Sequence, residues 1–147
     1  MQVLVDADAC PKNVLKIIRQ LQAEYRFRLI TVASFNHLFD NPDHITVGNE
    51  SQATDIEIIN RIQAGDLLVT HDYGLAALAL GKKALVIGIN GRIYSDATID
   101  FLLEERNLKS RLRRSGLKTK GPAARTETDD RRFRDNFLKL LSGTNEF

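Results

Sequence analysis

Two hydrophobic patterns alternate along this chain: short runs of consecutive apolar residues, and longer segments with apolar residues every three or four positions. The short runs have the length of buried strands, and the longer segments have the spacing of amphipathic helices. Strands are predicted at residues 2–5, 27–33, 45–47, 67–70 and 84–89. Helices are predicted from residue 11 through residue 21, at 51–63, at 73–80, at 95–114 and over a short final segment that ends at 141.

Polar segments separate these elements and set their expected ends. Residues 36–42 and 119–126 have the composition of loops, and Ser95 and Thr128 are of the residue type that caps helix N-termini. Strands that alternate with helices predict a parallel sheet built from βαβ units. The chain is therefore expected to form one α/β domain over residues 1–147. Its predicted architecture has three layers, with a mostly parallel sheet flanked by helices.

The composition limits the cellular setting. The 147 residues are 43% hydrophobic and 27% charged, which is ordinary for one globular domain. The single cysteine, Cys10, excludes an internal disulfide and a CxxC metal site. The first residues carry acids where a signal peptide would be cationic, and no apolar stretch approaches the ~20 residues that cross a bilayer. A cytoplasmic protein without a membrane partner is the expectation.

Positive charge is concentrated toward the C-terminus, although the net charge is only +2. Between residues 106 and 134, eleven lysines and arginines face only three acids. Basic residues at a helix C-terminus complement its dipole, but this segment is denser than that role requires. We expect a basic C-terminal extension, at about residues 106–147, that contacts the phosphates of a nucleic acid, with RNA as the favoured class. The expected phosphate-contacting residues are Arg92, Lys109, Arg111, Arg113, Arg114, Lys118 and Lys120.

Aspartates follow two of the predicted strands. Asp6 and Asp8 come directly after the first strand, and Asp72 comes just after the fourth. Ligands of open α/β sheets bind outside the carboxyl ends of the strands. If these two strands are neighbours, Asp6 and Asp72 share one crevice. Asp55 lies in the first turn of the helix before the fourth strand, so its side chain can face the same edge.

Carboxylates gathered in this way repel one another at neutral pH, and a hard cation relieves the repulsion. Mg²⁺ and Mn²⁺ prefer oxygen ligands and keep several waters. Such an ion, held by Asp6, Asp55 and Asp72, can activate a water and stabilise the leaving oxygen of a phosphate. Asp8 would complete the surroundings of the metal or orient the attacking water. All four aspartates are predicted catalytic residues, and the first three are the predicted metal ligands.

Simpler roles exist for several of these residues. An aspartate that follows a strand is often a helix N-cap, and capping alone would explain Asp72 or Asp55. Cys10 has no partner at metal-ligand spacing and fits a buried or half-buried thiol better than a nucleophile. His71 either serves the site or is a solvated strand-end histidine. The coincidence of four aspartates at one predicted edge still favours a metal site.

Six motifs, spread over nearly the whole chain, form a distinctive ordered set. They are Asp6-Ala7-Asp8-Ala9-Cys10-Pro11, Thr54-Asp55, Thr70-His71-Asp72 with Leu75-Ala76, Asn90-Gly91-Arg92, Gly121-Pro122 and the closing helix from Phe137 to Leu141. This set resembles the bacterial YaiI/YqxD family, also called UPF0178 or DUF188. That family is related to PIN-like domains, many of which are metal-dependent ribonucleases. The resemblance implies a PIN-like fold in which Asp6, Asp55 and Asp72 match the PIN acids, whereas Asp8 is an addition.

Three functions are compatible with these observations. The first is a metal-dependent nuclease, favoured as a ribonuclease, that hydrolyses phosphodiester bonds with carboxylate-bound Mg²⁺ or Mn²⁺. The second is a haloacid-dehalogenase-like phosphatase that uses Asp6 as its nucleophile and Asp8 as its general acid. The candidates for its later motifs are Ser34, Lys82 or Lys83, and Asp96 with Asp100. The third is a non-catalytic RNA-binding module. Walker A, GxGxxG, HExxH and GxSxG motifs are absent from the sequence, so four common enzyme classes lack support.

Overall fold

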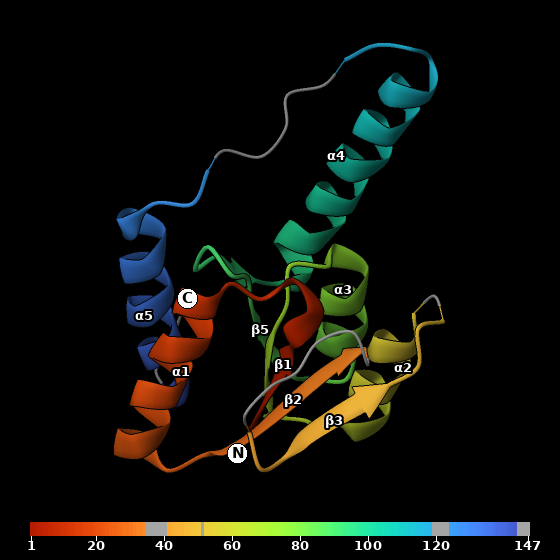
Figure 1. Ribbon diagram of the computed structural model, residues 1–147. Helices are drawn as coiled ribbons and strands as arrows, with labels where there is room; N and C mark the ends of the chain where they lie inside the picture. Colours follow the sequence, from red (N-terminus) through yellow and green to blue (C-terminus); the bar gives the residue numbers. More distant parts are fainter. Residues whose placement is uncertain (35–40, 51, 119–123, 144–147) are drawn as a thin grey trace.

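The protein is built on one six-stranded sheet (Figure 1). The computed structural model describes residues 1–34, 41–50, 52–118 and 124–143. The strands are β1 (Gln2–Asp6), β2 (Arg28–Ser34), β3 (His44–Val47), β4 (Leu67–Val69), β5 (Leu85–Ile87) and β6 (Ile93–Tyr94). Their order across the sheet is β3-β2-β1-β4-β5-β6, and all neighbours are parallel except the antiparallel pair β5 and β6.

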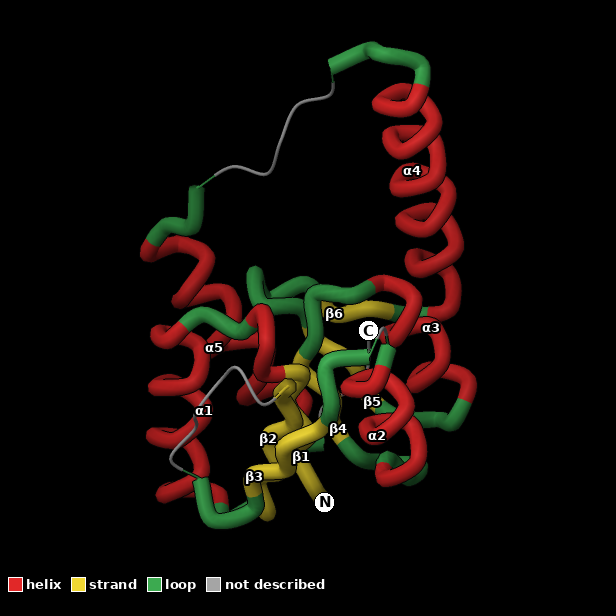
Figure 2. Tube along the Cα trace, turned by 45° about the vertical axis from the view of Figure 1, so that its right-hand side comes forward, coloured by secondary structure: helices red, strands yellow, loops and turns green. Residues whose placement is uncertain are grey.

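Helices cover both faces of this sheet and complete a three-layer α/β fold (Figure 2). They are the 3-10 turn η1 (Ala7–Ala9) and the α-helices α1 (Lys12–Tyr25), α2 (Ala53–Arg61), α3 (Tyr73–Gly81), α4 (Asp96–Arg114) and α5 (Glu127–Leu141). One face packs against α1 and α5, which also contact each other. The other face packs against α2, α3 and the first turns of α4.

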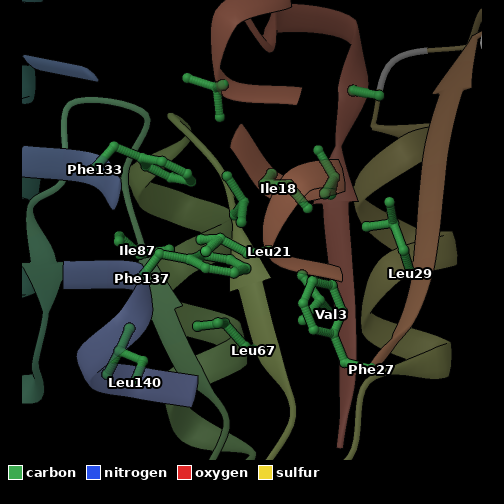
Figure 3. Packing of buried hydrophobic residues seen from close by; sticks show 14 of the residues in the cluster. Val3, Ile18, Leu21, Phe27, Leu29, Leu67, Ile87, Phe133, Phe137 and Leu140 are labelled. Carbon is green, nitrogen blue, oxygen red and sulfur yellow. The ribbon is translucent and has the colours of Figure 1, made fainter. Parts of the chain in front are cut away.

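Each strand supplies side chains to both faces, because successive residues of a strand point in opposite directions. In β1, Val3 and Val5 belong to the core beneath α1 and α5, and Leu4 belongs to the core beneath α2 and α3. Figure 3 shows the first of these cores. There the ring of Phe137 lies between two others, with centroids 5.9 Å from Phe27 and 5.4 Å from Phe133. The C-terminal helix is thus an integral part of the core.

The predicted α/β architecture is confirmed, with differences at particular elements. The five predicted strands are present close to their expected bounds, and β6 is an addition, because a two-residue strand carries no periodicity. The prediction of Thr128 as the final cap is wrong. Thr126 caps α5 in a capping box with Asp129, in which each side chain accepts the backbone N–H of the other. Residues 35–40 and 119–123, within the two expected loops, lie outside the described residues.

The turn between β5 and β6 holds α5 in place. Gly91 has φ +88°, and an added Cβ would lie 2.6 Å from backbone atoms of Arg132 and Phe133. The close approach allows the side-chain amide of Asn136 to donate a 2.6 Å hydrogen bond to the carbonyl of Gly91. The guanidinium of Arg125 donates another, of 2.5 Å, to the carbonyl of Ile89. Only glycine combines this backbone conformation with the space available, so the turn and helix form one packed unit.

Helix α4 extends well beyond the body of the domain (Figures 1 and 2). Of its 19 residues only Ile99 and Leu102, near its start, are buried. Ser95 and Thr98 form a capping box that stabilises this first turn, which confirms the predicted Ser95 cap. Across the described residues, no helix combines the length and apolar character that crossing a membrane requires.

Candidate functional site

Asp6 and Asp72 lie where the strand order reverses. β1 and β4 are parallel neighbours, with Val5 opposite Val69. The chain continues from β1 to β2 on one side and from β4 to β5 on the other, so the carboxyl ends of β1 and β4 flank a topological switch point. Ligands of open α/β sheets bind at such points. Asp6 ends β1, and Asp72 directly precedes α3.

All four aspartates line one open pocket of about 910 Å³ at this edge. Its lining comes from the ends of β1 and β2, the start of α2, the start of α3 and the inner side of α4. The lining residues with ionisable or hydroxyl side chains are Asp6, Asp8, Ser34, Glu50, Thr54, Asp55, His71, Asp72, Tyr73, Arg106, Lys109 and Arg113. Carboxylates from four separate elements therefore face one pocket that also contains three cations.

Asp6 is the most perturbed of these acids. Burial, together with the charges of Asp55, Asp72 and Asp8, raises its pKa from 3.8 to about 6. The hydroxyl of Thr70 opposes the shift by donating a 2.9 Å hydrogen bond to Oδ2 of Asp6. The charged form of a carboxyl group whose pKa is raised by burial and by neighbouring acids is stabilised when a cation binds beside it. The electrostatics at Asp6 therefore match those of a metal-binding carboxylate.

Asp55 and Asp72 stand at the first turns of two helices. Burial and the charge of Asp72 raise the pKa of Asp55, which lies in the first turn of α2 without capping it; the N-cap is Gln52. Asp72 does cap α3, since its Oδ1 accepts the N–H of Leu75 at 3.1 Å. The capping role expected as an alternative is thus present at Asp72, and its carboxylate still lines the pocket.

Asp8 has a more constrained position. Its carboxylate accepts the backbone N–H and the hydroxyl of Ser34, at 3.0 and 3.1 Å, and the hydroxyl of Thr54 at 3.1 Å. These bonds connect the end of β2 to the start of α2 through one side chain. Thr54 therefore serves Asp8 rather than capping its own helix. Asp8 is positioned to fix the walls of the pocket in which the other three acids lie.

The donor set fits Mg²⁺ or Mn²⁺. No three histidine, cysteine, aspartate or glutamate side chains in the described ranges form a preassembled metal-binding group. Mg²⁺ keeps several of its waters and is commonly bound through one or two carboxylates together with substrate phosphate. Asp6 with Asp55 or Asp72 supplies such a set, and all of the donors are the oxygen atoms that a hard cation prefers.

Three cations extend the pocket along α4. Arg106, Lys109 and Arg113 follow each other at spacings of three and four residues, which places them on one side of the helix. The guanidinium of Arg106 lies 3.9 Å from Oδ1 of Asp72. Lys109 also pairs with Glu105, at 3.2 Å. This inner row of α4, defined as Arg106, Lys109 and Arg113, joins the acids to the projecting end of the helix.

The other predicted phosphate contacts are scattered. Arg111 and Arg114 lie on the opposite side of α4, in a second surface hollow. Arg92 is exposed in the turn before β6 and is not among the residues that line the acid pocket. Lys118 is exposed beyond α4, and Lys120 lies outside the described residues. Sequence reasoning did not assign Arg106 to the site, although its position three residues before Lys109 on one helix is the signal that identifies it.

Two further residues were weighed from the sequence. His71 is exposed and lines the pocket beside Asp72, with its ring 6.3 Å from that of Tyr73. Cys10 is half-buried, and burial raises the pKa of its thiol to about 12. The thiolate is the nucleophilic form of cysteine, so this environment suppresses nucleophilic reactivity at Cys10.

Comparison with known proteins assigns the family. Residues 4–143 match the model of a family described as "Uncharacterized BCR, YaiI/YqxD family". The chain belongs to the YaiI/YqxD family. It is 47% identical to a UPF0178 protein of Heliobacterium modesticaldum, over 96% of this chain and 97% of the relative. UPF0178 proteins of Exiguobacterium sibiricum and Clostridium kluyveri are 41% and 38% identical, over 97% and 96% of this chain and 97% and 93% of theirs. No solved structure matches this chain.

In this member of the YaiI/YqxD family, the string from Asp6 to Pro11 forms a compact structural unit. Asp6 ends β1, the buried Ala7 begins η1, and Pro11 directly precedes α1. The 3-10 turn directs the carboxylate of Asp8 toward Ser34, the last residue of β2. The spacing of the two aspartates within the string thus places one at the switch point and the other in the pocket wall.

Proposed function

We propose that this protein is a metal-dependent nuclease, with RNA as its substrate class, built on a PIN-like version of the α/β fold. The observation that carries the proposal is one pocket lined by four aspartates at its base and by the inner row of α4 along its side. Cleavage of a nucleic-acid strand uses both sets of side chains. A metal held by the aspartates would act on the phosphate that reacts, and the cations of the inner row would bind the neighbouring phosphates.

Asp6, Asp55 and Asp72 would hold Mg²⁺ or Mn²⁺. When bound, the ion supplies an activated water and charge stabilisation for the leaving oxygen. Asp6 and Asp55 would contribute their charge only when deprotonated, and their raised pKa values link occupancy of the site to pH. Asp8 holds Ser34 and Thr54 together and so maintains the spacing of the walls around the three ligands.

The inner row of α4 would position the chain of phosphates. Successive cations three and four residues apart rise about 5 Å along the helix axis, so the row places its positive charges along one line. Contacts of this type hold the backbone without reading the sequence. Because the row begins at Asp72 and continues away from the domain, phosphates that follow the cut site would lie along α4.

The phosphatase alternative has weaker support. Ser34 does lie beside Asp8, but Lys82 follows the last residue of α3, and its ammonium group donates to the carbonyl of Ile59 near the end of α2. Both helices begin at the acid pocket, so Lys82 lies at the opposite end of α3 from that pocket. Neither Lys82 nor Lys83 lines the pocket, whose lysine is Lys109 of α4, whereas the nuclease proposal uses every aspartate in the pocket.

Cleavage of single-stranded RNA by purified protein, with and without Mn²⁺, tests the proposal. We expect cleavage only with divalent metal, and loss of cleavage in the Asp6→Asn, Asp72→Asn double variant. A Lys16→Gln variant, on the exposed side of α1, is the control. Metal-independent RNA binding without cleavage would establish the binding-module alternative. A phosphoryl-aspartate trapped at Asp6 would establish the phosphatase.

A further inference from the structure

The outer side of α4 carries apolar residues that the domain does not cover. Phe101 is 67% exposed and Leu108 is 50% exposed. They lie seven residues apart, which returns a helix to within about 20° of the same direction. Both line a hollow on the side of the helix away from the acid pocket, whose lining includes neither of them. These two side chains form an uncovered apolar line on a projecting helix.

Charged residues run beside this apolar line in a definite order. Glu104 and Arg111, also seven residues apart, line the same hollow and lie on the same side of Leu108. The line is acidic toward the start of the helix and basic toward its end. We define the outer face of α4 as Phe101, Glu104, Leu108 and Arg111. In a second copy of the helix that lies antiparallel to the first, the basic end of this face is opposite the acidic end of the first copy.

We propose that the outer face of α4 is a homodimer interface, in which two copies pair their α4 helices antiparallel about a two-fold axis close to Leu108. The symmetry decides the pairing. Glu104 and Arg111 are equally far from a midpoint between Asn107 and Leu108, so the two-fold axis places Glu104 of each copy opposite Arg111 of the other. The two Leu108 side chains meet at the centre. A parallel pair would instead place like charges together.

Energetic reasoning favours the same occupant. Beyond Leu102 no residue of α4 is buried, and a helical segment as short as this projecting part is marginal in water on its own. A second helix packed on this face would cover Phe101 and Leu108 and reduce the solvent-exposed surface of α4 in both copies. The outer part of α4 from Phe101 to Arg114 is about 20 Å long, so a pair of such helices buries less surface area than a standard interface. We therefore expect a dimer that dissociates at micromolar concentrations.

Pairing through the outer face leaves the acid pocket open. The inner row of α4, with Arg106, Lys109 and Arg113, lies on the other side of the helix and lines that pocket. The proposal is therefore independent of the proposed nuclease activity, and either one stands if the other fails. Together, the two faces would give a dimer with two acid pockets at opposite ends of a central helix pair.

Sedimentation equilibrium of the full chain tests the interface. We expect the mass to rise with concentration from 16.6 kDa toward twice that value. Leu108→Glu and Glu104→Arg should each weaken dimerisation at least tenfold. The double variant Glu104→Arg, Arg111→Glu exchanges the charges and should restore it. Gln20→Glu, an exposed change on α1, should have no effect. All four positions are exposed, and thermal melting of each variant verifies its fold.

Cross-linking supplies a second readout that depends on geometry. In a Cys10→Ser background, Leu108→Cys should form an intermolecular disulfide under mild oxidation, and Gln20→Cys should not. A chain that remains at 16.6 kDa at every concentration overturns the proposal. So does a dimer that Leu108→Glu leaves intact, or a charge exchange that fails to restore the pairing. An unaltered chain that stays monomeric, and whose RNA binding Leu108→Glu weakens, would assign the outer face to nucleic acid instead.

Discussion

The hydroxyl of Thr70 donates a 2.9 Å hydrogen bond to the carboxylate of Asp6. The same oxygen accepts the backbone N–H of Asp72 at 3.0 Å. One buried hydroxyl therefore connects the acid at the end of β1 to the loop that carries the acid after β4. Within the part of the chain that the structure describes, this bond is the one interaction that favours the charged form of Asp6, against burial and three neighbouring carboxylates that disfavour it. The stability of the fold should depend on that balance.

Replacing Asp6 by asparagine should stabilise the metal-free protein at pH 8. Folding raises the pKa of Asp6 from 3.8 to about 6, so its contribution to stability is full below pH 3.8 and is lost as the pH rises through about 6. Asparagine keeps an acceptor for Thr70 and has no charge. The gain should approach about 2–3 kcal/mol, given 1.36 kcal/mol for each pKa unit. Urea unfolding in the presence of a chelator measures it.

The pH dependence distinguishes this effect from a general improvement in packing. The advantage of Asp6→Asn over the unaltered chain should disappear near pH 4, where Asp6 is protonated in both states. Added Mn²⁺ at pH 8 should stabilise the unaltered chain and not the variant. Equal stability of the two proteins at pH 8 without metal would mean that the carboxylates do not strain the pocket.

Asp8 should matter more to stability than to metal affinity. Its carboxylate accepts hydrogen bonds from the backbone N–H and hydroxyl of Ser34 and from the hydroxyl of Thr54, and hydrogen bonds to a charged group contribute more than neutral ones. We expect Asp8→Asn to cost about 1–3 kcal/mol, because the amide presents hydrogens to donors. Thr54→Val should cost about 1 kcal/mol, and Thr54→Ser, which keeps the hydroxyl, should be close to neutral. Calorimetric Mn²⁺ titration of the folded variants would reveal any larger role of Asp8 as a ligand.

The inner row of α4 should determine how RNA binding responds to salt. Each phosphate contact to a single strand contributes about 0.7 to the slope of log affinity against log salt concentration. The double variant Lys109→Gln, Arg113→Gln should therefore lower that slope by about 1.4. Lys16→Gln with Lys83→Gln removes the same charge far from the pocket and should leave the slope unchanged. Equal slopes for both double variants would contradict a role for this row.

Gly91→Ala should be severely destabilising. The new Cβ would meet the backbone of α5 at 2.6 Å, and the residue would have to keep φ near +88°. Strain and overpacking together should cost about 3 kcal/mol or more. Gly65 has the same φ, +87°, with nothing within 4 Å of an added Cβ, so Gly65→Ala isolates the backbone effect at about 1 kcal/mol. Chemical denaturation of the two variants separates the two costs.

Periodicity and strand-end chemistry predicted much of this molecule. The run from Val3 to Val5 identified a buried strand, and the helical spacing that follows Pro11 identified α1. The expectation that Asp6 and Asp72 share an edge required β1 and β4 to be neighbours, and they are. Parallel strands bring their carboxyl ends together, so acids at two strand ends could be assigned to one pocket from the sequence.

Other features depend on contacts that a sequence pattern does not contain. The role of Thr54 depends on the return of the chain at η1, which directs Asp8 toward the end of β2. The two sides of α4 have similar composition, and only the packing of Ile99 and Leu102 on the domain decides which cations face the pocket. Thr126 and Thr128 are equally good caps by residue type, and the position of Asp129 selects Thr126.

The two central acids of the pocket are Asp6, which ends β1, and Asp72, which follows β4. These strands are separated by about 60 residues in sequence and pair only when the sheet forms, so no local segment of the chain contains the pocket. An unfolded or half-folded chain therefore has no place where these carboxylates meet. Any ion or phosphate chain that binds there recognises the finished sheet alone, and by mass action it draws the population toward that state. Ligand binding in the pocket is therefore coupled to folding, and both depend on the pairing of β1 with β4.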